Sequence, residues 1–484
     1  MQLAEIKNII SQYQTVESEN KLIIALLVAV LMGAVDSTIV ILALPTITVD
    51  LGTTLSLSIW IIMIYLLVIA VGTTQLGRLG DILSRKRIFN TGIALFTLGS
   101  ALCGASPTIL YLILFRGIQA SGAAMIQSNS GAIVADNFPP NRRGRVFGYT
   151  SVGYNAGAML GIVFGGLITT FIGWRYIFYI NVPIGIFAFI FAVRNIKPGK
   201  RVDNKLDIPG TTTLAISLSL ISYAVVDITA NGVDAFNELL VLAGLILVVI
   251  FVLIERVASR PLLPLKIFRI RILSFSIMAS FFQSLGFLAV VFIIIMYLQG
   301  IRGLSPLDSS LLLLPGYVVG SVLGPFFGKL TDRIGSRIPA TMGLFIMGLA
   351  ILVYLTITVT SLLYIVLVGS FLTGTGSSMF YPANNSAVMA NSPRELYGLS
   401  SGFLRTMANI GMLGSFIVAI TIASISVPRS VAFAVFAGVL NSLGSVSASF
   451  MTGIHSALLV ALLILAVAGI LSLSRGGENR PGQH

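Results

Sequence analysis

Long apolar segments alternate with short polar segments along almost the whole chain. A helix that crosses the hydrocarbon core of a bilayer needs about 20 mostly apolar residues. Fourteen segments meet this window criterion. They lie at about residues 21–44, 57–76, 88–105, 107–135, 145–170, 174–193, 208–227, 237–255, 272–299, 307–328, 337–358, 361–390, 398–425 and 455–474. The pattern therefore predicts an all-α integral membrane protein with fourteen transmembrane helices.

The composition agrees with this prediction and excludes several classes of protein. Of 484 residues, 56% are hydrophobic and only 10% are charged, whereas soluble domains carry about 25% charged residues. A soluble or disordered protein is therefore excluded, and the net charge of +13 is no reason to expect a nucleic-acid partner. The single cysteine, Cys103, and the two histidines, His455 and His484, are too few for a disulfide framework or a zinc centre. We expect no metal and no cofactor.

Lys and Arg collect in alternate loops, which predicts the orientation of the chain. With the N-terminus in the cytoplasm, 25 of the 30 basic residues fall on the cytoplasmic side. Three lie in outer loops, namely Arg175, Arg302 and Arg429. An excess of basic residues in cytoplasmic loops is the usual topology signal. We therefore expect a multi-pass protein of the cell membrane with both termini in the cytoplasm.

An internal repeat indicates two related halves. Residues 77–81 read Gly-Arg-Leu-Gly-Asp and residues 328–332 read Gly-Lys-Leu-Thr-Asp, each at the end of a predicted helix. A chance match between two basic loops is the alternative, but matching positions in two six-helix units favour duplication. The predicted units are an N-terminal six-helix bundle (1–195), two inserted helices with linkers (196–265) and a C-terminal six-helix bundle with a short tail (266–484). Two related bundles around a central cavity are typical of alternating-access carriers.

These loops are interpreted as a conformational latch, in which a carboxylate caps a helix or pairs with arginine. A plain basic loop is the alternative. The latch residues are Gly77, Asp81, Arg85, Gly328, Asp332 and Arg333.

A carboxylate and two arginines lie inside predicted spans. Asp36 is two thirds of the way through the first span, Arg116 lies in the fourth and Arg405 in the thirteenth. Charges at such positions are costly in lipid and usually mark a substrate or proton pathway. Desolvation favours a protonated carboxyl group and a nearby cation favours its ionised form, so Asp36 could exchange a proton for a cationic substrate. Structural hydrogen bonding, or snorkelling of Arg405 to the interface, is the alternative.

Small and polar residues complete the candidate site. Gly153, Gly157, Gly161 and Gly165 repeat at four-residue spacing and are followed by Gly166, which predicts a close helix contact. Pro325 follows Gly324 in the tenth span and predicts a kink there. Gln119, one turn after Arg116, should share its face. Further cavity candidates, each of which could equally be helix–helix hydrogen-bonding residues, are Tyr65, Asn155, Asn181, Tyr381, Asn384, Asn385, Arg405 and Asn409.

Five motifs in order resemble one known family. They are residues 36–40 with 43–45, Trp60 with Tyr65, residues 77–81, Arg116 with Gln119 and 122–124, and residues 174–178 with 181–185. Together they resemble the fourteen-helix drug/proton antiporter branch of the major facilitator superfamily. The resemblance implies two six-helix bundles plus two central helices, and proton-coupled multidrug efflux through Asp36, Arg116 and Gln119.

The chain departs from this pattern at several positions. Ile162 stands where the antiporter motif has proline, Ile82 replaces a usual arginine and Ser84 a usual glycine, whereas the second copy of the loop keeps Arg333 and Gly335. The latch is therefore expected to depend more on the second copy.

A secondary carrier fits the sequence better than the other membrane classes. An ATP-driven pump needs a phosphate-binding loop, a membrane enzyme needs a clustered catalytic site, and a channel a pore loop. We expect no enzymatic activity. We expect a monomer that exports lipophilic, cationic or neutral small molecules in exchange for protons, in contact with membrane lipids. A carrier for one metabolite, for an antibiotic that the cell makes, or an uptake symporter are the alternatives.

Overall fold

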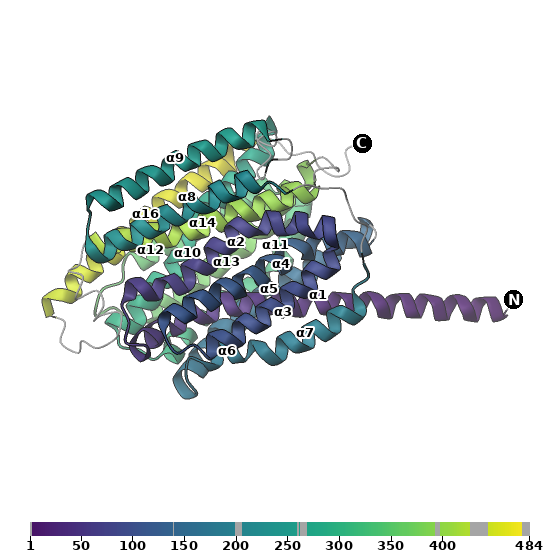
Figure 1. The fold of residues 1–484 in the computed structure, drawn as a ribbon, viewed down its shortest axis with the longest axis horizontal. Coiled ribbons are helices and arrows are strands. Elements are labelled where there is room, and N and C mark those ends of the chain that lie inside the picture. The colour runs from purple at the N-terminus through teal and green to yellow at the C-terminus, as the bar shows by residue number, and fades with distance from the viewer. Residues whose placement is uncertain are drawn as a thin grey trace.

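The computed structural model describes residues 2–138, 140–198, 206–258, 261, 269–392, 397–425 and 444–476. Within these residues, the regular secondary structure is helical and contains no strand, as Figure 1 shows. The expected all-α membrane fold is confirmed. The helices are α1 (Gln2–Asp50), α2 (Leu55–Leu83), α3 (Arg85–Gly104), α4 (Ile109–Asn137), α5 (Pro140–Phe171), α6 (Tyr176–Tyr179), α7 (Asn181–Asn195), α8 (Ile208–Asn231), α9 (Ala235–Val257), α10 (Arg271–Met296), the π-helix η2 (Tyr297–Ile301), α11 (Pro306–Ile334), α12 (Arg337–Tyr354), α13 (Tyr364–Asn391), α14 (Tyr397–Ile425) and α16 (Gly444–Ser474).

Each of the fourteen predicted spans coincides with a helix, with α6 and α7 sharing the sixth span. Among the described residues, eleven helices are long and apolar enough to cross a bilayer. The three other predicted spans coincide with α3, α5 and α13, and within α5 residues Ala156–Phe171 form a shorter apolar helix. The chain is therefore a multi-pass membrane protein.

Helix ends follow ordinary capping chemistry. Thr54, Asp207, Asp234 and Ser305 each accept a hydrogen bond from a backbone N–H in the first turn of the helix that they precede. Such side chains satisfy donors that have no partner within the helix. These caps explain why the apolar runs that start α2, α8, α9 and α11 begin where they do.

Two groups of helices pack mainly within themselves. In the first, α1 packs on α5, and α4 packs on α2 and α3. In the second, α13 packs on α11 and α12, and α10 packs on α14 and α16. The groups meet where α5 contacts α11 and where α2 contacts α14, while the α8–α9 pair contacts α2 and α14 through α8. In Figure 1, α9 lies along the outer edge of the bundle.

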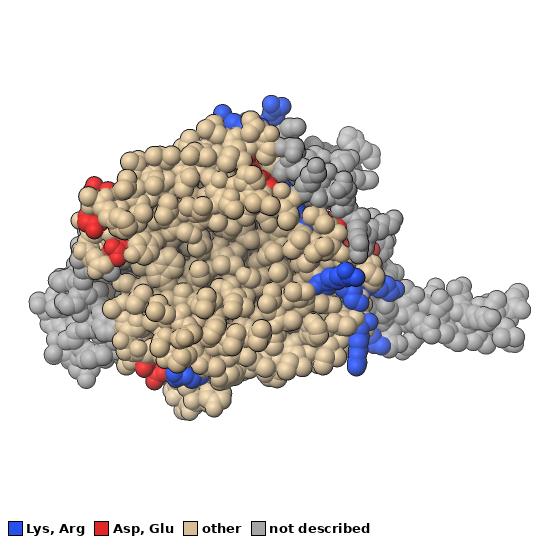
Figure 2. Space-filling view, in the orientation of Figure 1, with Lys and Arg blue, Asp and Glu red and all other residues tan. Residues whose placement is uncertain are grey.

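Charged side chains lie at the two ends of the helix bundle. On the face shown in Figure 2, most visible Lys and Arg side chains lie toward the end from which α1 projects. Several visible Asp and Glu side chains lie at the opposite end. The basic end is the one that the positive-inside rule assigns to the cytoplasm, and that assignment stays a prediction.

Candidate functional site

Asp36 lies in a fully buried ion pair between α1 and α4. Its Oδ2 accepts a hydrogen bond of 2.7 Å from Nη1 of Arg116. The exposed fractions of the two side chains are 0% and 2%. The two residues are 80 positions apart in the chain, and the packing of α4 within the first group of helices brings them together. A buried pair is stable only where the remaining polar atoms also have partners.

Polar side chains from α3, α4 and α7 supply those partners. Gln119 Nε2 donates to Asp36 Oδ1 at 2.8 Å and to Ser100 Oγ at 3.1 Å. Asn181 Nδ2 donates to the same two oxygens at 3.2 and 3.1 Å, and the Ser100 hydroxyl donates to the Phe178 carbonyl at 2.8 Å. Both oxygens of the Asp36 carboxylate therefore accept hydrogen bonds from protein side chains.

Arg116 has three further neighbours that hold its guanidinium in place. Its Nη1 also donates to Gln119 Oε1 at 2.7 Å, and its Nε donates to the Ile61 carbonyl of α2 at 3.2 Å. The ring of Tyr65 lies 4.2 Å from the guanidinium carbon, within cation–π distance. Of the predicted residues, Asp36, Tyr65, Arg116, Gln119 and Asn181 thus form one cluster. We call these five residues together with Ser100 the buried polar cluster.

The spaced glycines of α5 face α1 next to this cluster. A Cβ atom at Gly157 would lie 2.6 Å from the Leu31 carbonyl oxygen, and one at Gly165 would lie 3.1 Å from that of Ile39. Thr38 donates a hydrogen bond of 3.1 Å to the Ala158 carbonyl. The two backbones therefore approach closely around Asp36, and α5, which has Ile162 at the expected proline position, is helical throughout this contact.

Gly166 faces a different helix from Gly157, Gly161 and Gly165. A Cβ atom there would lie 2.9 Å from the Leu307 Cα atom of α11. The Leu307 backbone N–H also donates to Thr170 Oγ1 at 3.3 Å. Gly166 thus lies in the α5–α11 contact, and Pro325 lies inside α11 further along the chain.

The first copy of the repeated loop forms an ion-pair network within the first group of helices. Arg85 pairs with Asp81 at 2.8 Å and with Asp136 of α4 at 2.6 Å. Gly77 packs toward Ser128 of α4, with 3.5 Å between the Cβ positions. The network therefore connects α2, α3 and α4 to one another.

The structure describes fewer contacts for the second copy of the repeated loop. Arg333 is exposed, and no atom lies within 4 Å of a Cβ position at Gly328. The Asp332 side chain lies outside the described residues.

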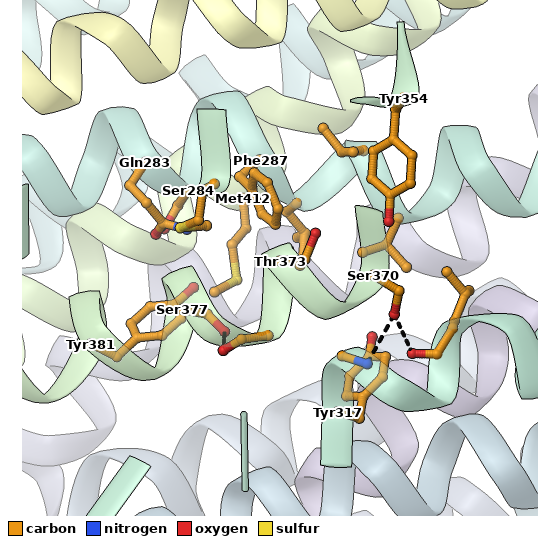
Figure 3. A pocket seen from close by; sticks show the side chains of 17 residues that line it. Gln283, Ser284, Phe287, Tyr317, Tyr354, Ser370, Thr373, Ser377, Tyr381 and Met412 are labelled. Atoms are coloured by element: carbon orange, nitrogen blue, oxygen red, sulfur yellow. Dashed lines mark hydrogen bonds between the residues drawn. The ribbon is translucent and has the colours of Figure 1, made fainter. Parts of the chain in front are cut away.

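A cavity of about 160 Å³ lies in the second group of helices. Its lining is mostly apolar, with hydroxyl and amide groups at a few points (Figure 3). The Ser370 hydroxyl donates to the Leu313 carbonyl at 2.7 Å and accepts from the Gly316 N–H at 3.0 Å. The polar lining residues include Gln283, Ser284, Tyr317, Tyr354, Ser370, Thr373, Ser377 and Tyr381. Tyr381 is the predicted cavity residue that lines it.

Arg405 joins the two groups of helices. Its Nη1 donates a hydrogen bond of 2.7 Å to the Gln127 carbonyl of α4. Asn409, one turn further along α14, donates to Gln127 Oε1 at 3.4 Å. Beside them, the hydroxyls of Thr74 and Thr406 lie 2.7 Å apart. Arg405 and Asn409 thus lie at the contact of α14 with α2 and α4, away from the buried polar cluster.

The other predicted cavity residues have different surroundings. Asn384 is buried and donates to the Ser276 carbonyl of α10 at 3.1 Å, a contact between two helices of the same group. The Asn155 side chain lies outside the described residues. Asn384 therefore fits the role of helix–helix hydrogen bonding.

Sequence reasoning missed Ser100, Gln127 and Gln283. Ser100 accepts from both amides of the buried polar cluster, yet a serine in a transmembrane helix is too common to stand out. Gln283, like Gln119, is an amide side chain within an apolar predicted span, and this pattern alone could have marked it as a candidate. A search for every intramembrane amide would have found Gln127 and Gln283.

Comparison with known proteins identifies the family. The sequence profile of the Major Facilitator Superfamily matches residues 26–416. The riboflavin transporter RibZ of Clostridioides difficile is 30% identical over 395 residues, which cover 80% of this chain and 84% of that protein. The tetracenomycin C resistance and export protein of Streptomyces glaucescens is 29% identical, covering 83% and 76%. The multidrug transporter protein MdtP of Bacillus subtilis is also 29% identical, covering 81% and 74%.

Solved structures share the fold. A bacterial homolog of the human lysosomal transporter Spinster, in an inward-facing and unoccupied conformation, superposes with a TM-score of 0.65 at 16% identity, over 95% of this chain and 97% of that one. The peptide transporter POT in complex with sulfate gives 0.63 at 18% identity, over 94% and 96%. With the profile covering most of the described helices, the resemblance to the superfamily is confirmed: the chain belongs to the Major Facilitator Superfamily and is a membrane transporter.

Proposed function

We propose that this transporter is a proton-coupled antiporter that exports amphipathic small molecules from the cytoplasm by alternating access. One observation carries the proposal, namely the carboxylate of Asp36 buried in mid-membrane against Arg116. An ionisable group within a transmembrane bundle usually marks a proton or substrate pathway. Asp36 is the proton carrier in this proposal, and Arg116 is its counter-ion.

The hydrogen bonds around Asp36 explain how a proton would change the structure. When a proton binds Oδ2, the carboxyl group loses its negative charge, and the hydrogen bond from Arg116 loses its charge-assisted strength. The guanidinium then needs other acceptors, and Gln119 Oε1 and the Ile61 carbonyl are already within 3.2 Å. Protonation therefore weakens the connection of α1 to α4 and α2, while Arg116 keeps two other hydrogen-bond acceptors.

The packing of α1 on α5 gives this change a route to the contact between the two groups of helices. α5 contacts α1 through its spaced glycines and α11 through Gly166. A shift of α1 is transmitted to α5, and hence to the α5–α11 contact, because well-packed helices move as units. The two helix groups, as residues 1–195 and 266–484, are the moving bodies in this proposal, and residues 196–265 form an accessory pair. The ion-pair network of Asp81, Arg85 and Asp136 stabilises one arrangement of the N-terminal body in this proposal.

The relatives support export but leave a second candidate. The tetracenomycin C protein is described as a resistance and export protein and MdtP as a multidrug transporter, which favours the fourteen-helix drug/proton antiporter branch. RibZ is described as a riboflavin transporter, which favours a carrier for one metabolite. The proposal further places both termini in the cytoplasm of a cell-membrane protein that acts as a monomer.

The test measures proton movement in proteoliposomes that contain the purified chain or its Asp36→Asn variant. Ethidium, tetracenomycin C and riboflavin are added separately, and a pH-sensitive dye inside the vesicles reports proton flux. We expect at least one compound to drive proton flux in the native chain and none to do so in the variant. Asp50→Asn is the matched control, because Asp50 lies on the same helix but is about half exposed and pairs with Arg175 at 2.8 Å.

Each outcome bears on the proposal. Proton flux that survives in Asp36→Asn contradicts the role of Asp36. Substrate movement without any proton flux in the native chain contradicts antiport and favours a facilitator. Flux driven by riboflavin and by neither of the other compounds supports the metabolite carrier.

A further inference from the structure

Two arginines inside the predicted spans, Arg116 and Arg405, differ in their partners within the described part of the chain. Asp36 and Arg116 neutralise each other. Arg405 donates to the Gln127 backbone carbonyl, and no carboxylate of the described residues forms an ion pair with it. A guanidinium in a region of low dielectric is stabilised by an anion far more than by a carbonyl group. The space around Arg405 therefore favours a ligand with negative charge.

Arg405 lies on the helix face that leads to the cavity. Arg405, Asn409 and Met412 are spaced by four and three residues on α14, so they share one face of the helix. Met412 lines the cavity, and Arg405 lies about 10 Å from it along the helix axis. The Arg405 residue is partly buried, and its guanidinium lies at the contact between the two helix groups, where Nη1 donates to the Gln127 carbonyl.

The cavity itself suits an aromatic ring. Phe287, Tyr317, Tyr381 and Met412 line it together with the amide of Gln283, and aromatic rings and thioethers pack well against planar groups. In Figure 3 these labelled side chains lie around the same space. Tyr154 of α5, from the other helix group, lies near Arg405, Tyr317 and Tyr381. Tyr154 thus places a side chain of the first helix group close to both Arg405 and two tyrosines of the cavity lining.

We propose that the cavity and Arg405 form one subsite for aromatic acids, in which the cavity holds the ring and Arg405 binds a carboxylate. This proposal rests on the proposed function, because it specifies the substrate class of the same transporter. It also differs from the sequence-based expectation of cationic or neutral substrates. The Asp36 carboxylate, which suggested a cationic substrate, already accepts three hydrogen bonds from the buried polar cluster, whereas a cation near Arg405 would meet a like charge.

The test compares three probes that share one ring and differ in charge, namely 2-naphthoate, 2-naphthamide and 2-naphthylmethylammonium. Equilibrium dialysis against the full-length chain in detergent measures their dissociation constants. We expect 2-naphthoate to bind about tenfold more tightly than 2-naphthamide, as a charged hydrogen bond allows, and the ammonium to bind most weakly. This ranking in the native chain needs no variant, so a folding defect cannot obscure it. Equal binding of the three probes, tightest binding of the ammonium, or no binding of 2-naphthoate overturns the proposal.

Variants of Arg405 then test whether this residue binds the carboxylate. In Arg405→Gln, 2-naphthoate should lose about tenfold in affinity while 2-naphthamide changes little. Arg405→Lys should keep part of the preference, because lysine keeps the charge but not the planar fork. Arg271→Gln is the matched control, since Arg271 is exposed and also donates to a backbone carbonyl, that of Ser474, at 3.0 Å. A preference for the acid that persists in Arg405→Gln contradicts the role of Arg405.

The experiment separates this proposal from the proposed antiport. Binding at equilibrium needs no proton movement, so Asp36→Asn should keep the preference for 2-naphthoate. If proton flux is absent from the native chain while 2-naphthoate is preferred, antiport fails and the subsite stands. If flux is present and the preference is absent, the subsite fails and antiport stands.

Discussion

The ion pair of Asp36 with Arg116 should behave as a buried pair that is costly to break from either side. In Arg116→Gln, Asp36 Oδ1 keeps its hydrogen bonds from Gln119 and Asn181, but Oδ2 loses its donor at 2.7 Å. Removing one partner of a buried pair costs about 3–5 kcal/mol. We expect a decrease in the free energy of unfolding within this range, because the remaining donors stabilise only one of the two oxygens.

A second substitution in the same background should recover part of this loss. Asp36→Asn removes the unpaired charge and keeps an oxygen that can accept from Gln119 and Asn181. An unsatisfied neutral polar group costs about 1–3 kcal/mol when it is buried, and an unsatisfied charge costs more. The double variant should therefore unfold at a higher temperature than Arg116→Gln. Scanning fluorimetry of the purified proteins in detergent gives the order of the unfolding temperatures.

The exposed pair of Arg175 with Asp50 is the control for this measurement. Its side chains are 41% and 47% exposed, so Arg175→Gln should cost about 1 kcal/mol or less. The reasoning is refuted if Arg175→Gln lowers the unfolding temperature as much as Arg116→Gln. It is also refuted if the double variant unfolds at a lower temperature than both single variants, because the losses would then be additive and the two residues independent.

Three further substitutions test the packing and the repeated loop. Gly161→Val should lower both the transport rate in proteoliposomes and the unfolding temperature, since its Cβ would lie 2.5 Å from the Val35 carbonyl oxygen, whereas Gly33→Ala, with no atom within 4 Å of its Cβ position, should change neither. Ser84→Gly should raise stability by about 1 kcal/mol in the same unfolding assay, because Ser84 has a φ of 152°, which a side chain disfavours. Arg85→Gln should cost about 1 kcal/mol or slightly more, and should lower the maximal transport rate more than the substrate affinity in uptake kinetics.

The positions of the helices could be predicted because hydropathy is a local property. Windows of about 20 apolar residues located a helix for each span, including α3, α5 and α13, which are not among the candidate membrane spans of the described residues. These helices were still found, because few charges interrupt them. The break between α6 and α7 near Ile180 was not predicted, since both pieces belong to one apolar run.

The contacts of the candidate site could be predicted only in part. Gln119 was placed beside Arg116 because three residues nearly complete a helical turn. The pairing of Arg116 with Asp36 depends on how α1 packs against α4, and hydropathy holds no information about such packing. For the same reason, Gln127 could not be identified as the partner of Arg405.

The repeated loop shows how one substitution alters a predicted feature. In the second copy, Gly335 ends α11 with a φ of 87°, a conformation that glycine adopts without strain. In the first copy, Ser84 takes the equivalent place between α2 and α3 with a positive φ. The ion pairs of Arg85 with Asp81 and Asp136 hold the helices on either side of this residue, which explains how serine is tolerated there.

Helix α4 connects the proposed proton carrier to the proposed substrate subsite. It carries Arg116, which pairs with Asp36, and Gln127, whose carbonyl accepts from Arg405. Eleven residues separate the two positions, close to three helical turns and about 16 Å along the axis, so both lie on nearly the same face of one rigid element. If both proposals hold, protonation of Asp36 weakens the hold on α4 at one position, and binding of an anion by Arg405 weakens it at the other. The two proposed events would therefore act on the same helix, which would give proton and substrate a physical means of influencing each other across the contact between the two helix groups.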